Sequence, residues 1–296
     1  MTRRADTGTA TGDGTLAGEV RRPRNLHRAA SGSIHDDATA RRLGFRGGTI
    51  AGSYHMEQAV PLALALFGRA WFDNGTMAAY FRAPTVDGEA VQAFARRTPG
   101  PADGGGERAE LWMDTADGRR VWDGSATVGD PGGPSALADR MTGRDADQVR
   151  ILSFLRVGEV IDLGELRLDG ERQRERLRSG LMTEPLDWYG DSSPWGPAVA
   201  SPPTEVSFTF ESVKQAIVRR RGPAVGLYGA IEIRHLTGPL LLGETYRVSS
   251  TVLALGCTPK TEYMWTETVA ADRDGTPVTS VLMMSRVMKA SSDLYA

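Results

Sequence analysis

His35 is the residue of this chain best suited to acid–base chemistry, because an imidazole titrates near neutral pH and can accept or donate a proton. It is followed by Asp37, by Gly44-Phe45 and by the glycine-rich segment Gly47–Gly52. A turn that opens a helix presents backbone N–H groups, and these stabilise a developing oxyanion. The sequence therefore combines a proton-transfer group with candidate oxyanion donors.

The spacing of these residues resembles the signature of the MaoC-like acyl-thioester dehydratases and (R)-specific enoyl-CoA hydratases. That family has a catalytic Asp, then an Asn-Pro-x-His motif whose His lies five residues after the Asp, then an Asp, an Ala, Gly-Phe and a glycine-rich turn. The matching positions here are His35, Asp37, Ala40, Gly44 and Phe45. The resemblance implies a double hot-dog fold and a hydro-lyase of fatty-acid or polyketide metabolism. It also implies an acyl-CoA or acyl-carrier-protein thioester as partner, with no cofactor.

Two departures keep other functions open. Ala30 stands where the family has its catalytic Asp, and Gly32 and Ser33 replace Asn-Pro. The first alternative is a hot-dog thioesterase, in which a carboxylate or Gln58 positions water on the thioester carbonyl. The second is an acyl-thioester-binding protein with altered chemistry.

The expected donors and water-holding groups surround His35 in the sequence. Gly52 and Ser53 are the candidates for the oxyanion site, and Gly48 belongs to the same turn. Water could be held by Ser31 or Ser33. His55 follows the turn closely, but a place on a helix surface explains it equally well.

Two glutamates could replace the missing Asp as partners of His35. Single-domain hot-dog dehydratases use a Glu on the central helix together with a His from the opposite subunit. Glu57 and Glu205 occupy nearly matching places in the two halves of this chain. The alternative is that both acids simply stabilise the first turns of their helices.

An internal repeat predicts the elements that position these residues. Gly47–Gly52 aligns with Gly196–Ser201, and a helical pattern follows each, near Ser53–Trp71 and Pro202–Arg219. Farther along, each half contains β-rich runs joined by an Asp-Gly turn, which is typical of a hairpin. We therefore expect an α+β fold with two tandem repeats, each a long helix wrapped by an antiparallel sheet.

The expected domain limits follow from this repeat. Residues 1–15 should be disordered, 16–129 form the first repeat, 130–156 a linker, and 157–290 a second repeat with a degenerate site. Thr183 or Glu184 should stand there at the place of His35. A cluster of aromatic residues could plug that site, line an acyl tunnel or belong to the core: Trp188, Tyr189 and Trp195.

Composition excludes several classes of protein. The 296 residues carry a formal net charge of −2, which argues against nucleic-acid or anionic-membrane partners. Cys257 is the only cysteine, and the 4 histidines show no metal-binding spacing. The longest apolar stretch is interrupted by Pro61 and is too short to cross a bilayer. We expect a cytoplasmic protein without a metal, with a homodimer possible.

Overall fold

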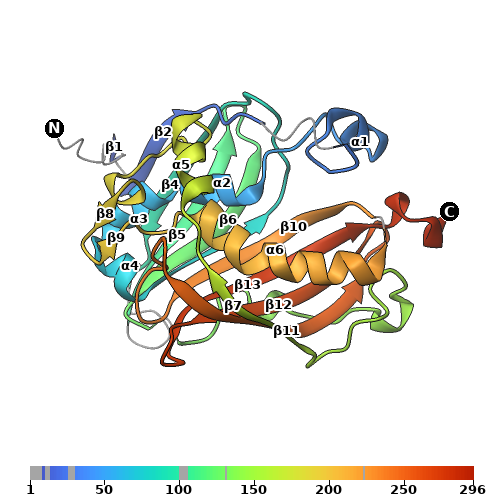
Figure 1. Ribbon diagram of the computed structural model, residues 1–296. Coiled ribbons are helices and arrows are strands. Elements are labelled where there is room, and N and C mark those ends of the chain that lie inside the picture. The colour runs from blue at the N-terminus through green and yellow to red at the C-terminus, as the bar shows by residue number, and fades with distance from the viewer. Residues whose placement is uncertain (1–8, 11–13, 26–30, 100–105, 131, 223) are drawn as a thin grey trace.

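The computed structural model describes residues 9–10, 14–25, 31–99, 106–130, 132–222 and 224–296 (Figure 1). Within them, eleven strands form one sheet in the order β1-β2-β4-β5-β6-β3-β10-β13-β12-β11-β7. The strands of the first half are β1 (Thr9–Ala10), β2 (Thr15–Arg21), β3 (Gly75–Phe81), β4 (Val91–Arg97), β5 (Glu107–Thr115) and β6 (Arg120–Val128). Those of the second half are β7 (Val160–Arg167), β10 (Gly226–His235), β11 (Thr245–Cys257), β12 (Thr261–Ala271) and β13 (Pro277–Met288).

The two halves join at their edges as a pseudo-dimer. Strand β3 pairs antiparallel with β10, in a register that includes Met77 opposite Ile233 and Tyr80 opposite Ala230. The order β2-β4-β5-β6-β3 on one side of this junction is repeated by β7-β11-β12-β13-β10 on the other. The α+β double hot-dog fold is thereby confirmed.

The helices of the two repeats differ in continuity. The central helix of the second repeat is continuous, α6 (Pro202–Arg221), whereas the corresponding stretch of the first repeat forms α2 (Gly52–Glu57), α3 (Val60–Phe67) and α4 (Ala70–Asn74). The expectation of a single helix over Ser53–Trp71 is therefore wrong. Pro61 cannot donate a hydrogen bond to the carbonyl four residues before it, and Gly68, with φ of 62°, ends α3.

The remaining elements are short and lie between these two repeats or within their loops. They are α1 (Asp37–Arg42), α5 (Glu171–Arg178), the two-stranded sheet of β8 (Ser192–Ser193) and β9 (Gly196–Pro197), and 3₁₀ turns at Ala138–Arg140, Ala146–Gln148, Asp187–Tyr189, Lys289–Ser291 and Asp293–Tyr295. No helix among the described residues is both long and apolar enough to cross a membrane.

The N-terminal segment is more ordered than expected where the structure describes it. Thr9 and Ala10 form β1, which pairs with β2, and Thr15 begins β2. These residues are strand residues rather than part of a disordered tail, because the edge of β2 offers them unpaired backbone groups. The rest of residues 1–13 lies outside the described residues.

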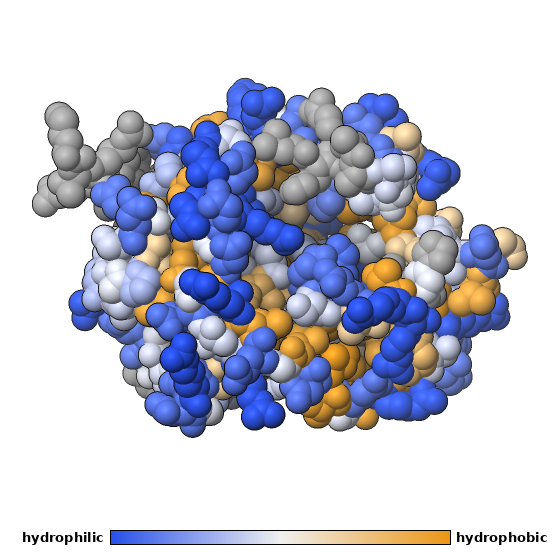
Figure 2. Space-filling view, viewed as in Figure 1, coloured by the Kyte–Doolittle hydropathy of each residue, from blue (hydrophilic) through white to orange (hydrophobic). Residues whose placement is uncertain are grey.

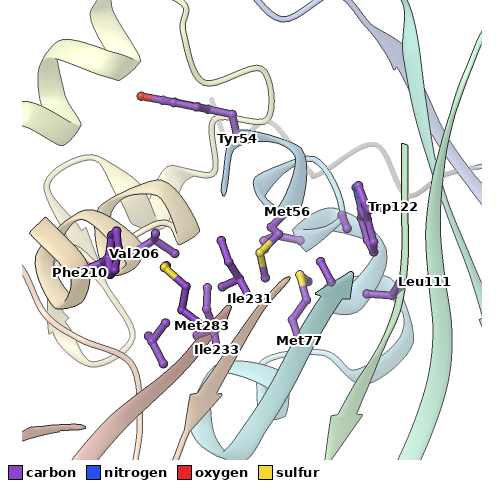
Figure 3. Packing of buried hydrophobic residues seen from close by; sticks show 14 of the residues in the cluster. Tyr54, Met56, Met77, Leu111, Trp122, Val206, Phe210, Ile231, Ile233 and Met283 are labelled. Atoms are coloured by element: carbon purple, nitrogen blue, oxygen red, sulfur yellow. The ribbon is translucent and has the colours of Figure 1, made fainter. Parts of the chain in front are cut away.

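One hydrophobic core runs through both repeats. Met56 of α2 and Val206 and Phe210 of α6 point toward strand residues of both halves of the sheet, among them Met77 and Ile233 (Figure 3). All five side chains are buried. The helices of both repeats therefore pack on the same joined sheet.

Matching hydrogen bonds identify equivalent positions in the repeats. Ile50 N–H donates to the Thr85 carbonyl and Ala200 N–H to the Leu240 carbonyl, both near 3 Å. Thr49 N–H donates to the Ile34 carbonyl, and Val199 N–H donates to the Trp188 carbonyl. In the same way, the N–H groups of Arg82 and Leu236 donate to the carbonyls of the equivalent strand residues Val121 and Val278. The equivalent pairs are therefore His35 with Tyr189, Gly52 with Pro202, His55 with Glu205, and Phe81 with His235. The sequence alignment of the turns was wrong by one residue, and its match of His35 with Thr183 or Glu184 was wrong.

Candidate active site

The larger cavity, called pocket 1 here, has a volume of about 820 Å³ and lies between the repeats. The first repeat contributes the segments around His35, Gly52 and Thr85, and the second contributes α6 and the adjoining ends of β10, β12 and β13. Figure 2 shows a hollow on this face of the molecule, between the segment that carries α1 and the surface of α6. The volume lies within the range of small-molecule sites.

His35 lines pocket 1, and its imidazole has a fixed orientation. The ring Nδ1 lies 2.7 Å from the Thr49 carbonyl oxygen. Because a carbonyl oxygen only accepts hydrogen bonds, Nδ1 carries the proton and the basic lone pair of the neutral ring is on Nε2. His35 can therefore act as a base through Nε2.

The backbone around His35 is held by Asn25 and by the motif residue Asp37. The side-chain amide of Asn25 donates to the His35 carbonyl at 2.8 Å, and Asp37 Oδ1 accepts from Gly48 N–H at 2.7 Å. A Cβ on Gly48 would lie 2.0 Å from the His35 carbonyl oxygen, so only glycine fits. Gly48 is thus a packing residue, and its N–H is engaged by Asp37 rather than offered to an oxyanion.

Two neighbouring aspartates have different roles beside His35. Asp36 is the N-cap of α1 and accepts hydrogen bonds from Ala38 and Thr39 N–H. Asp37 instead accepts from the backbone of the turn at Gly48.

The turn at the start of α2 is the candidate oxyanion site. Gly52 is the first residue of α2 and lines pocket 1, whereas Ser53 is buried and is not among the lining residues. The first α2 bond is made by Tyr54 N–H to the Ala51 carbonyl, so the N–H of Gly52 precedes the helical hydrogen bonds. The Phe81 ring occupies the space of a Cβ at Gly52, with its Cζ 2.3 Å from that position.

His55 is a pocket residue that the sequence analysis did not assign. It is 2 % exposed, not on a helix surface, and it lines pocket 1 together with Thr85. Its Nε2 lies 2.6 Å from Thr85 Oγ1 and its Nδ1 3.2 Å from Gln58 Oε1. Burial lowers the pKa of His55 to about 4, so the ring is neutral at pH 7.

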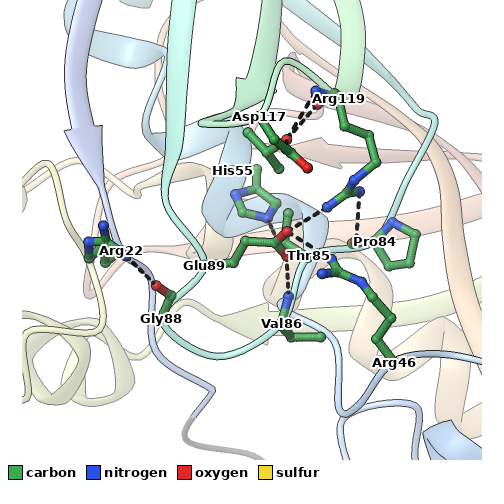
Figure 4. Close-up of polar contacts among 11 residues, drawn as sticks. Arg22, Arg46, His55, Pro84, Thr85, Val86, Gly88, Glu89, Asp117 and Arg119 are labelled. Carbon is green, nitrogen blue, oxygen red and sulfur yellow. Dashed lines mark hydrogen bonds and ion pairs between the residues drawn. The ribbon is translucent and has the colours of Figure 1, made fainter.

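The turn that carries Thr85 is fixed by ionic contacts. Glu89 accepts hydrogen bonds from Arg46, from Arg119 at 2.6 Å and from Val86 N–H at 3.0 Å. Figure 4 shows this carboxylate between the two guanidinium groups, with His55 reaching Thr85 beside it.

Neither glutamate partners His35. Glu205 Oε1 lies 3.0 Å from His235 Nε2, and both side chains are buried. Burial alone would lower the pKa of His235, but the Glu205 carboxylate outweighs it and the pKa is raised. Glu57 accepts from Glu184 N–H at 2.8 Å, and burial raises its pKa to about 8. Both acids are buried in the protein instead of facing pocket 1.

The two serines and the alanine of the motif have different positions. Ser33 lines pocket 1, and its Oγ accepts from His35 N–H at 3.2 Å. Ser31 is exposed and does not line the pocket, so it does not hold water beside His35. Ala30 lies outside the described residues.

Pocket 1 is basic. Among the described residues that line it none is Asp or Glu, whereas Arg82, Lys214, Lys260 and Arg286 are present. The Arg82 guanidinium pairs with Asp123, and Lys214 is 3.7 Å from Glu211. Lys260 is exposed. The lining thus favours a ligand with negative charge at one end.

The equivalent region of the second repeat is filled by aromatic rings. Tyr189, the counterpart of His35, is fully buried. Phe72 contacts Trp188, Trp195 and His235 at ring-centroid distances of 5.8, 5.6 and 5.4 Å. Tyr189 and Phe72 therefore belong to the core, and the partly buried Trp188 and Trp195 pack against it. Outside that core remains a smaller cavity of about 630 Å³, called pocket 2 here, formed by β2, α3 and the segment 182–188.

No cluster of three or more potential metal ligands occurs among the residues that the structure describes.

Comparison with known proteins supports the architecture. No family model and no curated protein matches the sequence. Among solved structures, a Chloroflexus aurantiacus protein superimposes on this chain with a TM-score of 0.62 at 16% identity. It is named as a MaoC domain dehydratase, without an established activity. The match covers 93% of this chain and 94% of that protein. A Mycobacterium tuberculosis protein described as having a double hot-dog fold gives 0.56 at 12% identity, covering 91% and 96%.

A third structure is the dehydratase domain of PpsC from Mycobacterium tuberculosis, solved in complex with C12:1-CoA. It gives a TM-score of 0.50 at 12% identity and covers 95% of this chain and 98% of its own. At such identities the likeness concerns the fold. The chain has the double hot-dog fold, which it shares with proteins named as MaoC-like dehydratases.

Proposed function

We propose that the protein is a hydratase or dehydratase of acyl thioesters, with His35 as its acid–base residue. The observation that carries the proposal is the His35 imidazole, held through Nδ1 by the Thr49 carbonyl at the wall of an 820 Å³ cavity between the repeats. The turn at Gly52 borders the same cavity. The dehydratase neighbours, one of them bound to an acyl-CoA, support the substrate class.

The chemistry follows from the tautomer of His35. In hydration, Nε2 accepts a proton from water while the water oxygen forms a bond to the β-carbon of the enoyl thioester. The electron pair of the double bond moves to the thioester oxygen, and the Gly52 N–H stabilises the resulting enolate. The imidazolium then returns its proton to the α-carbon, which leaves a 3-hydroxyacyl thioester and neutral His35. Dehydration is the reverse.

A single base suffices for this sequence because the proton taken from water is the proton given to carbon. No carboxylate among the described residues lining pocket 1 is available as a second acid. The described lining thus differs from a site with an Asp–His pair, and we assign both proton transfers to His35.

The basic lining suits the phosphates of coenzyme A. Lys214 on α6 and Lys260 before β12 are both exposed and both border pocket 1. Apolar residues behind them, such as Phe210, Ile217 and Met264, would contact the acyl chain. We therefore assign acyl-CoA as the carrier form.

The test uses two thioesters. With crotonyl-CoA, we expect loss of the conjugated enoyl-thioester absorbance without release of free thiol. With hexanoyl-CoA, which has no double bond, we expect no reaction. Release of thiol from hexanoyl-CoA would identify a thioesterase, and inertness toward enoyl-CoA substrates of several chain lengths would contradict the proposal.

A further inference from the structure

Pocket 2 is the remnant of the second repeat's cleft. It lies against α3 of the first repeat, as pocket 1 lies against α6 of the second. Ile50 and Ala200 are equivalent, and counting from them pairs the later residues of the two repeats. Leu64 of pocket 2 then corresponds to Lys214 of pocket 1, and Gly68 corresponds to Val218. Pocket 2 thus keeps the cavity but has lost its basic residue on the helix.

The lining of pocket 2 is aliphatic with paired charges. Its apolar residues include Pro61, Leu62, Leu64, Met182, Pro185, Leu186 and Trp188. The Arg21 guanidinium pairs with Glu184 and, at 2.8 Å, with Glu19. Among the described residues of the lining, the acids Glu19, Glu184 and Asp187 outnumber the bases Arg21 and Arg69. An anionic ligand is therefore disfavoured, and an aliphatic ligand with an uncharged head is favoured.

A chain of hydrogen bonds connects the two cavities. Gln58 Nε2 donates to Thr183 Oγ1 at 2.8 Å, and both residues line pocket 2. Gln58 Oε1 accepts from His55 Nδ1, so His55 Nε2 accepts from the Thr85 hydroxyl at 2.6 Å. His55 and Thr85 line pocket 1. The direction of every bond in the chain is fixed by the Gln58 amide.

Helix α2 also connects the two cavities through the backbone. Gln58 follows directly after α2, whose first residue, Gly52, borders pocket 1. The residue before it, Glu57, accepts from the backbone N–H of Glu184 in the wall of pocket 2. A ligand that moves the segment 182–184 must therefore act on the end of α2.

We infer that pocket 2 is a second binding site, for an aliphatic molecule with an uncharged hydroxyl or ester head, and that His55 in pocket 1 responds to its occupancy through Gln58. The head would compete for the Thr183 hydroxyl or the Gln58 amide, and the chain would contact Leu62 and Leu64. The inference goes beyond the proposed reaction and does not depend on it.

The binding test is calorimetric titration with 1-octanol and with octanoate. Leu64→Trp fills pocket 2, and Ile217→Trp is the matched change in pocket 1. We expect Leu64→Trp to weaken octanol binding at least about tenfold, a loss of about 1.4 kcal/mol, while Ile217→Trp leaves it within about twofold. Octanoate should bind pocket 2 more weakly than octanol does. Absence of octanol binding, or loss of binding only in Ile217→Trp, would overturn the site.

The coupling test is the ¹⁵N chemical shifts of the His55 ring, assigned by their absence in His55→Gln. Octanol should shift both ring nitrogens in the wild-type protein. In Gln58→Leu octanol should still bind but should no longer shift them. Unchanged His55 resonances in the saturated wild-type protein would refute the coupling, and this outcome is independent of whether any thioester is turned over.

Discussion

The two repeats have the same architecture, but residues at equivalent positions border a cavity in the first repeat and are buried in the second. His35 and Gly52 of the first repeat border a cavity, whereas their counterparts Tyr189 and Pro202 are buried in the second. Tyr189 lies beside a set of packed aromatic rings, and the counterpart of His55 is Glu205, which bonds His235 within the core. The difference shows that one fold can place equivalent residues either at a cavity or in the core. In the second repeat Glu205 is paired with His235, and aromatic rings pack beside pocket 2.

The two cavities also differ in charge. The described lining of pocket 1 contains bases and no acids, while that of pocket 2 contains three acids and two bases. Because both cavities lie between the same two repeats, this difference resides in a few side chains and not in the backbone. Substitutions at equivalent positions should therefore have unequal effects.

The largest contrast is expected at the starts of the central helices. Gly52→Ala places a Cβ within 2.3 Å of the Phe81 ring and must displace the ring or the turn. We expect kcat/KM for crotonyl-CoA to fall roughly 10²-fold, as for loss of an oxyanion donor. Pro202→Ala, at the equivalent position of the second repeat, should leave it within about twofold.

A partial recovery of kcat/KM in Gly52→Ala/Phe81→Leu would attribute the loss to this contact. Wild-type kinetics in Gly52→Ala would remove the turn from the site.

The charge difference predicts an intermediate effect. Lys214→Glu combined with Lys260→Glu should raise KM for an acyl-CoA about tenfold at low ionic strength, with a smaller effect at high salt. The control is Arg69→Glu, which reverses a charge at pocket 2 and should leave KM unchanged. Equal effects of the two changes would mean that bulk charge, not the mouth of pocket 1, determines KM.

Glu57 predicts the pH dependence of stability. Its pKa is about 8 in the folded protein and near 4.5 in the unfolded chain, so between these values the folded state holds the extra proton. The free energy of unfolding should therefore fall as pH rises through this window, by at most roughly 1.4 kcal/mol per pH unit. Urea unfolding between pH 5 and 8 should show a flatter dependence in Glu57→Gln than in the wild type.

The exposed Glu110→Gln serves as control for this series. If Glu57→Gln kept the wild-type slope, the carboxyl would have to be ionised in the folded protein at neutral pH.

The smallest effect is expected at Tyr189. Its hydroxyl is buried and makes no hydrogen bond to the residues that the structure describes. Tyr189→Phe should therefore change the free energy of unfolding by no more than about 0.5 kcal/mol, or raise it slightly, and should leave turnover unchanged. Circular-dichroism melts and the crotonyl-CoA assay check both parts, and a marked loss of turnover would show that the second cleft contributes to the reaction.

The sequence was sufficient to predict the repeat and the hairpins, because these depend on local patterns. A motif of fixed spacing singled out His35, which lines pocket 1. The sequence did not reveal the break at Pro61 in the first helix, since an apolar periodicity continues through the proline. His55 was missed for a related reason. Its burial depends on Thr85, which is brought to it by a turn thirty residues later.

The partners of the glutamates could not be predicted either. Glu57 and Glu205 are close to equivalent by spacing, which suggested a shared role opposite His35. In the structure the alignment of the two repeats is shifted by one residue from the alignment made on sequence, so Glu205 is the counterpart of His55. Glu205 is hydrogen-bonded to His235 on β10. A one-residue shift changes the face of a helix on which a side chain lies, and no single-sequence pattern determines it.

The assignment of both proton transfers to His35 is tested by the rate of crotonyl-CoA hydration by His35→Ala. The account predicts a fall in kcat of roughly 10²–10⁴, with Tm and KM close to those of the wild type. The matched change His55→Gln should lower kcat less, because His55 positions Thr85 rather than transferring a proton. A His35→Ala protein with wild-type kcat on a substrate that the wild type hydrates would contradict the account.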